Sequence, residues 1–207
     1  MAERSDTSDE TVFLPGAGLN LIRHIDWGVA SPDILAQLIE EIPWRRESIT
    51  LFGRTHLQPR LICWMGDPGC AYSYSGKRHE PIAWHPLVAR LRGRAEALAQ
   101  ASFNSVLLNH YRDGHDSMGF HADDEPELGD YPVIASLSFG AERTIHFRHR
   151  HDRSIPAQRI TLPDSSLLVM GGETQRNWKH AIAKTRKPAG PRINLTFRRI
   201  LVHTEGR

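Results

Sequence analysis

The pattern of apolar and polar positions changes near residue 104, where helical spacing gives way to short alternating runs. In the stretch 31–44, apolar residues recur three and four positions apart, behind a capping Ser31 and a first-turn Pro32. The stretch 85–103 is rich in Ala, Leu and Arg and has the same period. The sequence therefore predicts two amphipathic helices in the N-terminal half of the chain.

After residue 104 the apolar runs are short, rich in β-branched residues, and separated by Gly, Pro and Asp. These runs predict strands at 105–111, 131–140, 143–149, 158–163, 165–172, 178–182 and 192–202. Many short strands preceded by helices are typical of a barrel or a jelly roll. We predict an α+β fold that is mainly β, a double-stranded β-helix (jelly roll) with the N-terminal helices packed on one side.

The length of 207 residues suits a single domain with a short extension. Residues 1–11 are polar and poor in hydrophobic side chains, which predicts a disordered N-terminal tail. We expect residues 12–207 to form one domain, with the jelly-roll core at about 104–203.

The last predicted strand, RINLTFR, alternates strictly between apolar and polar side chains. One face carries Ile193, Leu195 and Phe197, and the other carries Arg192, Asn194, Thr196 and Arg198. A strand with one face in water gives this alternation. So does a strand whose polar face looks into a barrel, where two arginines would form an anion site. Asn109 and Tyr111 share a strand face in the same way, and these residues alone leave both interpretations open.

Charge is distributed unevenly along the chain. The net charge is +2, but residues 143–207 carry 14 Lys and Arg against 4 Asp and Glu. A basic half favours an anionic partner such as nucleic acid, and a solvated surface with biased arginine usage would explain it equally well.

The two cysteines, Cys63 and Cys70, have the spacing of neither a metal site nor a disulfide framework. This usage predicts a reducing, cytoplasmic location. No apolar run approaches the ~20 residues that a membrane helix needs, so we expect no membrane partner. The N-terminus lacks the hydrophobic segment of a signal peptide.

Two His-x-Asp pairs occur in the chain. On a strand, such a pair places an imidazole and a carboxylate on one face, where both can bind one cation. A single pair is weak evidence in a chain with 12 histidines. His24 and Asp26 precede the first helix without suitable partners, and we interpret them as structural. His121 and Asp123 follow a glycine-rich turn before the β-rich half and form the candidate metal pair.

Two histidines and one carboxylate on three facial positions are the ligand set of non-haem Fe(II) oxygenases. The third ligand should come from a distant strand, and His180 in NWKHAI is the best candidate. Arg192 follows 12 residues later on the alternating strand. A cosubstrate with two carboxylates needs such a cation at its far end. The combination arises by chance much more rarely than any of its parts.

Taken together, these residues resemble the AlkB family of Fe(II)/2-oxoglutarate dioxygenases, which reverse alkylation damage in nucleic acid. The similarity covers roughly residues 43–203, and its joint motif HxD…H…RxNxTFR is highly specific. The matching stretches are 59–76, 104–125, 135–149, 166–182 and 191–201. The RINLTFR ending and LFG at 51–53 look most similar to the homologues that act on duplex DNA.

The resemblance implies a role for each polar residue of these motifs. It implies an Fe(II) site made by His121, Asp123 and His180, with O₂ as a reactant. It implies a 2-oxoglutarate site made by Asn109, Tyr111, Arg192, Asn194, Thr196 and Arg198. In that site Arg192 would pair with the distal carboxylate, and Arg198 would support the end near the metal.

The resemblance also implies a nucleotide-recognition region at about 45–80. Tyr72 and Tyr74 match positions that stack on or border the target base, and Glu125 matches an acidic position that contacts the base edge. Phe52 matches a hairpin tip that wedges into the duplex. Each residue also has an ordinary interpretation as a strand aromatic, a solvated acid or a core side chain. Arg143 is a candidate to orient the metal carboxylate.

We therefore predict an enzyme, a monomer, that oxidatively demethylates bases such as 1-methyladenine and 3-methylcytosine in alkylated DNA. The residues do not rank these lesions. Alternatives are the same chemistry on RNA or on a protein side chain, a nucleic-acid-binding module with an inactive site, and a cupin-like metal isomerase that needs no 2-oxoglutarate. The intact set of metal ligands and arginines argues against the binding module.

Overall fold

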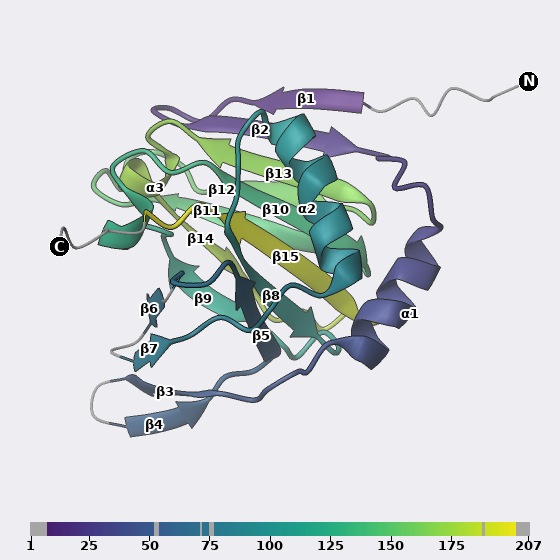
Figure 1. The fold of residues 1–207 in the computed structure, drawn as a ribbon. Coiled ribbons are helices and arrows are strands. Elements are labelled where there is room, and N and C mark those ends of the chain that lie inside the picture. Colours follow the sequence, from purple (N-terminus) through teal and green to yellow (C-terminus); the bar gives the residue numbers. More distant parts are fainter. Residues whose placement is uncertain (1–7, 52–53, 71, 75–76, 188, 202–207) are drawn as a thin grey trace, which may run out of the picture.

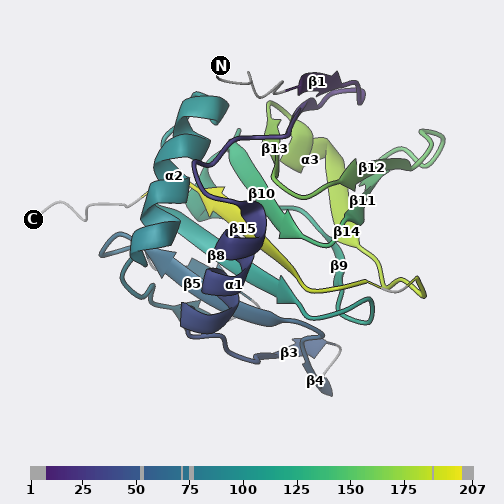
Figure 2. The ribbon, with the colours of Figure 1, turned by 90° about the vertical axis from the view of Figure 1, so that its right-hand side faces the viewer.

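The computed structural model describes residues 8–51, 54–70, 72–74, 77–187 and 189–201. It describes side chains for residues 9–48, 56–70, 80–187 and 189–201. Two antiparallel sheets face each other, and two helices cover the outer side of the larger sheet (Figures 1 and 2). This is the predicted jelly roll with helices on one side. Among the described residues, no helix has the length and apolar character needed to cross a membrane.

Both predicted helices are present. Helix α1 spans Ser31–Glu41 and α2 spans Pro86–Ala99. Their buried leucine, isoleucine and valine side chains pack against the larger sheet in one core cluster. The predicted cap is wrong, because Ala30 occupies the N-cap position and the Ser31 hydroxyl instead donates to Asp164 Oδ1 at 2.6 Å.

The larger sheet has the strand order β1-β2-β13-β10-β15-β8-β5. In that order its strands are Ser8–Val12, Gly18–Arg23, Ser166–Gly171, Ile134–Gly140, Arg192–Arg198, Ser105–Tyr111 and Leu61–Gly66. The smaller sheet has the order β12-β11-β14-β9, with strands Gln158–Leu162, Arg143–His149, Trp178–Ile182 and Met118–His121. All seven strands predicted after residue 104 are therefore present.

Two short hairpins lie next to each other on one side of the sheets (Figure 1). They pair β3 (Ser48–Leu51) with β4 (Arg54–Leu57), and β6 (Tyr72–Tyr74) with β7 (Lys77–His79). Both fall within the predicted recognition region. The remaining short elements are a 3-10 turn at Pro126–Leu128 and helix α3 at Thr174–Asn177.

Residues 8–11, which we predicted to be part of a disordered tail, form most of β1. This strand pairs with β2 from Ser8 opposite Arg23 to Val12 opposite Leu19. The reason is that β2 itself buries Leu19 and Leu21 against the sheet and so offers a hydrogen-bonding edge to the preceding segment. Residues 1–7 lie outside the described part of the chain.

Strand β15 explains the strict alternation of RINLTFR. It lies between β10 and β8, so it is no edge strand, and all seven of its side chains are buried. Its apolar residues join the core beneath the helices. Its polar residues line the space between the two sheets. The barrel interpretation is therefore correct, and the water-facing one is wrong.

Candidate metal and cosubstrate site

A cavity lies between the two sheets. Its wall contains every residue implied for the metal and the cosubstrate, namely His121, Asp123, His180, Asn109, Tyr111, Arg192, Asn194, Thr196 and Arg198. Met170, Ile145, Leu162 and Ile182 supply apolar surface to the same wall. These residues come from seven separate strands and one loop and converge on one space.

The three predicted metal ligands come together at one point of this cavity. His121 ends β9 and pairs with His180 on the neighbouring β14, and Asp123 follows two residues after His121. Their ligand atoms all lie within 4.8 Å of one another, and the two imidazole centroids are 4.3 Å apart. His121 Nδ1 donates to the Gly119 carbonyl at 2.9 Å, which leaves its Nε2 for a metal.

Asp123 is held by two contacts from distant strands and loops. Arg198 Nη2 donates to Asp123 Oδ1, and the Asp123 backbone N–H donates to Gln175 Oε1 at 2.9 Å. The other carboxylate oxygen, Oδ2, lies 3.8 Å from His180 Nε2 and has no hydrogen-bond partner among the described residues. One oxygen is therefore fixed, while the other is left for a cation.

The electrostatics of the cavity keep these groups in the forms that bind a metal. Burial raises the pKa of Asp123, but the charge of Arg198, followed by those of His180 and His121, outweighs it and lowers the pKa to about 2. Burial, together with the neighbouring His121, lowers the pKa of His180 to about 3. Burial also lowers the pKa of His121. At neutral pH the carboxylate is ionised and both imidazoles are neutral, so a metal has no proton to displace.

The opposite part of the cavity holds a buried cation. Arg192 pairs with Tyr111 across the sheet, and its guanidinium carbon lies 5.2 Å from the tyrosine ring centroid. Its Nη2 donates to Ser138 Oγ at 2.9 Å, but Nε and Nη1 have no partner among the described residues, although Arg192 is 1% exposed. Burial lowers the pKa of Arg192 to about 10, so it stays charged at neutral pH. Two unused donors on a buried guanidinium favour an anionic ligand.

Asn109 lies one position further along the polar face of β8, opposite Asn194. Arg60 Nε donates to Asn109 Oδ1 at 2.6 Å, which leaves the amide NH₂ of Asn109 for a ligand. Asn194 Nδ2 donates to Ser136 Oγ at 2.8 Å and to the Leu137 carbonyl at 3.0 Å. Both amide hydrogens of Asn194 are thus taken, so the donors left for carboxylate oxygens are the Asn109 amide and the guanidinium of Arg192.

Three neighbours of the site differ from our sequence interpretation. Arg143 does not reach Asp123. It donates to three backbone carbonyls, of Asp113, Asp116 and Ala183, because it begins β11 beside those turns. Arg198 instead contacts the Asp123 carboxylate and holds it in place, the role that we had expected of Arg143. Gln175 accepts a hydrogen bond from the Asp123 backbone, and Arg60 donates one to Asn109; the sequence predicted neither contact.

Of the four residues predicted to contact the base, the structure describes the side chain of Glu125 alone. Tyr72 and Tyr74 lie on β6, but their side chains, like the whole of Phe52, fall outside the described residues. Glu125 is half-buried at the start of the 3-10 turn and does not line the cavity. Base contact by these four residues stays a prediction. Asp124 is exposed and accepts a hydrogen bond from Arg150 at 2.5 Å.

The other His-x-Asp pair behaves as an ordinary turn. His24 has a positive φ of 55°, and Asp26 Oδ1 accepts a hydrogen bond from the Gly28 backbone at 2.8 Å. Among the described residues, the only group of three metal-ligating side chains is the one in the cavity.

Comparison with known proteins agrees with this site. Residues 29–198 match the family model of the 2OG-Fe(II) oxygenase superfamily. Alpha-ketoglutarate-dependent dioxygenase alkB homolog 3 of Homo sapiens is 38% identical over 193 residues, which cover 89% of this chain and 65% of that protein. DNA oxidative demethylase ALKBH2 of Bos taurus is 38% identical over 198 residues, which cover 91% and 71% of the two chains.

A solved structure of OsALKBH1 superposes with a TM-score of 0.60 and covers 92% of this chain and all of that one. At 17% identity it shows the fold alone. The chain spans 65% of the length of the human homolog 3 that it matches. The cofactors of the matching family are Fe(II), 2-oxoglutarate and O₂. From the family match over residues 29–198 and the identity to AlkB homologues, this chain belongs to the AlkB group of the 2OG-Fe(II) oxygenase superfamily.

Proposed function

We propose that this protein is an Fe(II)- and 2-oxoglutarate-dependent oxidative demethylase of alkylated DNA bases. The observation that carries the proposal is the convergence of three ligand atoms within 4.8 Å in one cavity that also holds the buried Arg192. Relatives named DNA oxidative demethylase, 36% to 41% identical, support DNA as the substrate.

In this proposal His121, Asp123 and His180 hold Fe(II), and the unused donors of Arg192 take the distal carboxylate of 2-oxoglutarate. Asn109, Tyr111, Asn194 and Thr196 line the space between these two ends. Bound Fe(II), 2-oxoglutarate and O₂ supply oxidation of a methyl C–H bond, after which the hydroxymethyl group leaves the base as formaldehyde. Arg198 keeps Asp123 ionised and oriented, and the apolar wall excludes bulk water.

A basic groove lies on the outer face of the smaller sheet, on the side opposite the one that carries His121 and His180, and suits a phosphate backbone. It is lined by Phe120, Arg148, Arg150, Arg153 and Lys179, together with neighbouring loop residues. Phe120, which precedes His121, is 40% exposed, and the Arg148 guanidinium lies 4.4 Å from its ring centroid. DNA bound by its phosphates along this face would have to flip a base out of the stack for that base to reach the cavity on the other side of the sheet.

Reversing charge in this groove should weaken DNA binding. For the double variant Arg148→Glu and Lys179→Glu we expect at least a tenfold loss of affinity at low salt, roughly the effect of losing two phosphate contacts. The slope of log affinity against log salt should also become shallower. Fluorescence anisotropy with a labelled oligonucleotide measures both. Arg94→Glu, on the exposed side of α2, is the control, and an equal loss in that variant would contradict a specific groove.

Arg60 should matter for the cosubstrate through Asn109. We expect Arg60→Met to weaken 2-oxoglutarate binding by about tenfold, because the Asn109 amide loses the partner that fixes its orientation. Titration calorimetry with Mn(II) in place of iron reports this affinity without turnover. The exposed Arg45→Met serves as the control. Unchanged affinity in Arg60→Met, alongside weakened binding in Asn109→Ala, would show that Asn109 needs no such support.

The proposed activity is tested with one substrate panel. The protein, Fe(II), 2-oxoglutarate and O₂ are incubated with methylated single-stranded DNA, duplex DNA, single-stranded RNA and a methylated peptide, and mass spectrometry follows the products. We expect loss of the methyl group from DNA with stoichiometric succinate. Turnover of RNA or peptide alone would favour the alternative substrates. Duplex DNA as the poorest DNA substrate would contradict the proposed wedge at Phe52.

We further propose that the protein acts as a monomer in the cytoplasm. The support for the location is that Cys63 and Cys70 are both free and buried, the state expected in a reducing compartment. Sedimentation and fractionation test the two statements separately.

A further inference from the structure

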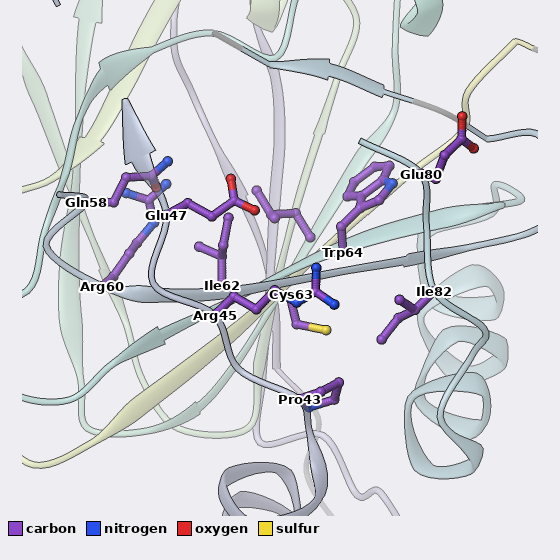
Figure 3. A pocket seen from close by; sticks show the side chains of 11 residues that line it. Pro43, Arg45, Glu47, Gln58, Arg60, Ile62, Cys63, Trp64, Glu80 and Ile82 are labelled. Carbon is purple, nitrogen blue, oxygen red and sulfur yellow. The ribbon is translucent and has the colours of Figure 1, made fainter. Parts of the chain in front are cut away.

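A second cavity lies beside the candidate site over strand β5 (Figure 3). Its wall includes Gln58, Arg60, Ile62, Trp64, Ile82 and Leu107. Ile62 pairs with Asn109 across the sheet, and Arg60 donates to the Asn109 side chain. The walls of the two cavities therefore meet at the contact between Arg60 and Asn109.

Gln58 is the unusual residue of this second cavity. It is 1% exposed, yet neither its Nε2 nor its Oε1 has a hydrogen-bond partner among the described residues. Its backbone N–H donates to the Glu47 carbonyl at 2.8 Å, which fixes its position. Figure 3 shows its amide next to Arg60 at one end of the cavity. A buried amide without partners is unfavourable in the free protein, and a ligand with a neighbouring donor and acceptor would satisfy it.

The rest of the wall limits the ligand. Ile62, Ile82 and Leu107 are apolar and suit the faces of a flat ring. Arg45, Glu47 and Glu80 add charged groups elsewhere on the wall, which suit polar groups on the ring's edge (Figure 3). A nucleobase has this character, and the proposed demethylase would present one beside the metal site. A glutamine amide makes two hydrogen bonds with the adjacent N6 and N7 of adenine. Methylation at N1 leaves both atoms available, whereas 3-methylcytosine offers only its N4 group on the equivalent edge.

We propose that Gln58 is a specificity-determining residue that reads the N6/N7 edge of the flipped base and favours 1-methyladenine over 3-methylcytosine. The proposal rests on the proposed demethylase function. Arg60 links the cavity that contains Gln58 to the cosubstrate site. Its side chain lines the second cavity and also donates a hydrogen bond to Asn109.

The test compares kcat/KM for two single-stranded oligonucleotides that differ only in the lesion. Gln58→Leu keeps the size of the side chain and removes both hydrogen-bonding groups. We expect the preference for 1-methyladenine to fall about tenfold, the effect of losing a bidentate contact to one base. Anisotropy with Mn(II) and 2-oxoglutarate should show the same change in relative affinity without turnover. The Tm of the free variant should not fall, because the amide that it removes has no partner.

Gln37→Leu, an exposed glutamine on α1, is the matched control and should leave the preference unchanged. Gln58→Met is the second variant if Gln58→Leu does not fold. A folded, active Gln58 variant with the wild-type preference would overturn the inference and leave the demethylase function intact. A wild-type protein that processes neither lesion would overturn the demethylase function, and the inference with it.

Discussion

Asp123→Ala is expected to abolish the formation of succinate and formaldehyde while DNA binding is retained. The variant loses one of three converging ligands, and Arg198 loses the carboxylate that it contacts. Residues that only support metal ligands typically change activity by about 10- to 100-fold, so loss of a ligand should exceed that range and reach at least ~10³-fold. Coupled assays of succinate and formaldehyde measure the loss, and anisotropy measures DNA binding.

Asp124→Ala is the matched control for this experiment. Asp124 is the next residue in the chain, but it is exposed and contacts Arg150 rather than the cavity. We expect it to retain activity. Because removal of Asp123 leaves Arg198 buried beside an empty position, Asp123→Asn, which keeps the shape and one hydrogen bond, separates loss of the ligand from loss of folding. Normal turnover in a folded Asp123 variant would contradict the proposed iron site.

Arg192→Met is expected to weaken 2-oxoglutarate binding by at least about 100-fold, the lower end of what a buried charge-assisted pair contributes. Its two unused donors are the best-placed partners in the cavity for a carboxylate at the end away from the metal ligands. Titration calorimetry with Mn(II) gives the affinity directly. Metal binding itself should change little, because Arg192 contacts none of the three ligands in the structure.

Thermal unfolding adds an independent readout for Arg192. In the absence of 2-oxoglutarate, Arg192→Met should be at least as stable as the wild type, because it removes a buried cation that lacks an anionic partner. Added 2-oxoglutarate should raise the Tm of the wild type and not that of the variant. Arg94→Met on α2 is the control. Equal stabilisation of both proteins by 2-oxoglutarate would place the cosubstrate somewhere other than beside Arg192.

The sequence was informative wherever a pattern has a short period. Helical spacing identified α1 and α2, and short β-rich runs identified seven of the eight strands after residue 104, missing only β9 (Met118–His121). It failed for β1, whose polar residues are ordered only because β2 offers an edge to pair with. It also failed for the cap of α1, because the Ser31 hydroxyl finds Asp164, 133 residues away.

In the site, too, residues in short sequence patterns could be predicted, and contacts between distant residues could not. His121, Asp123 and the polar face of β15 could be found because they form motifs with local spacing, whereas His180 was singled out through the ligand set of the non-haem Fe(II) oxygenases. The side chains that position them could not, since Arg60 meets Asn109 and Gln175 meets Asp123 through the register of the sheets and the path of a loop. Spacing predicted neither contact. The expectation that Arg143 would hold Asp123 was wrong because local spacing does not show which arginine the fold places beside the carboxylate. In the structure Arg198, on β15, contacts it.

A crystal structure with Mn(II) and 2-oxoglutarate tests the central claim most directly, because anomalous scattering locates the metal independently of the protein atoms. The account predicts one metal peak bonded to His121 Nε2, Asp123 Oδ2 and His180 Nε2, with the distal carboxylate of 2-oxoglutarate on Arg192. A metal bound elsewhere, or a cavity in which these three side chains point apart while 2-oxoglutarate is present, would contradict it.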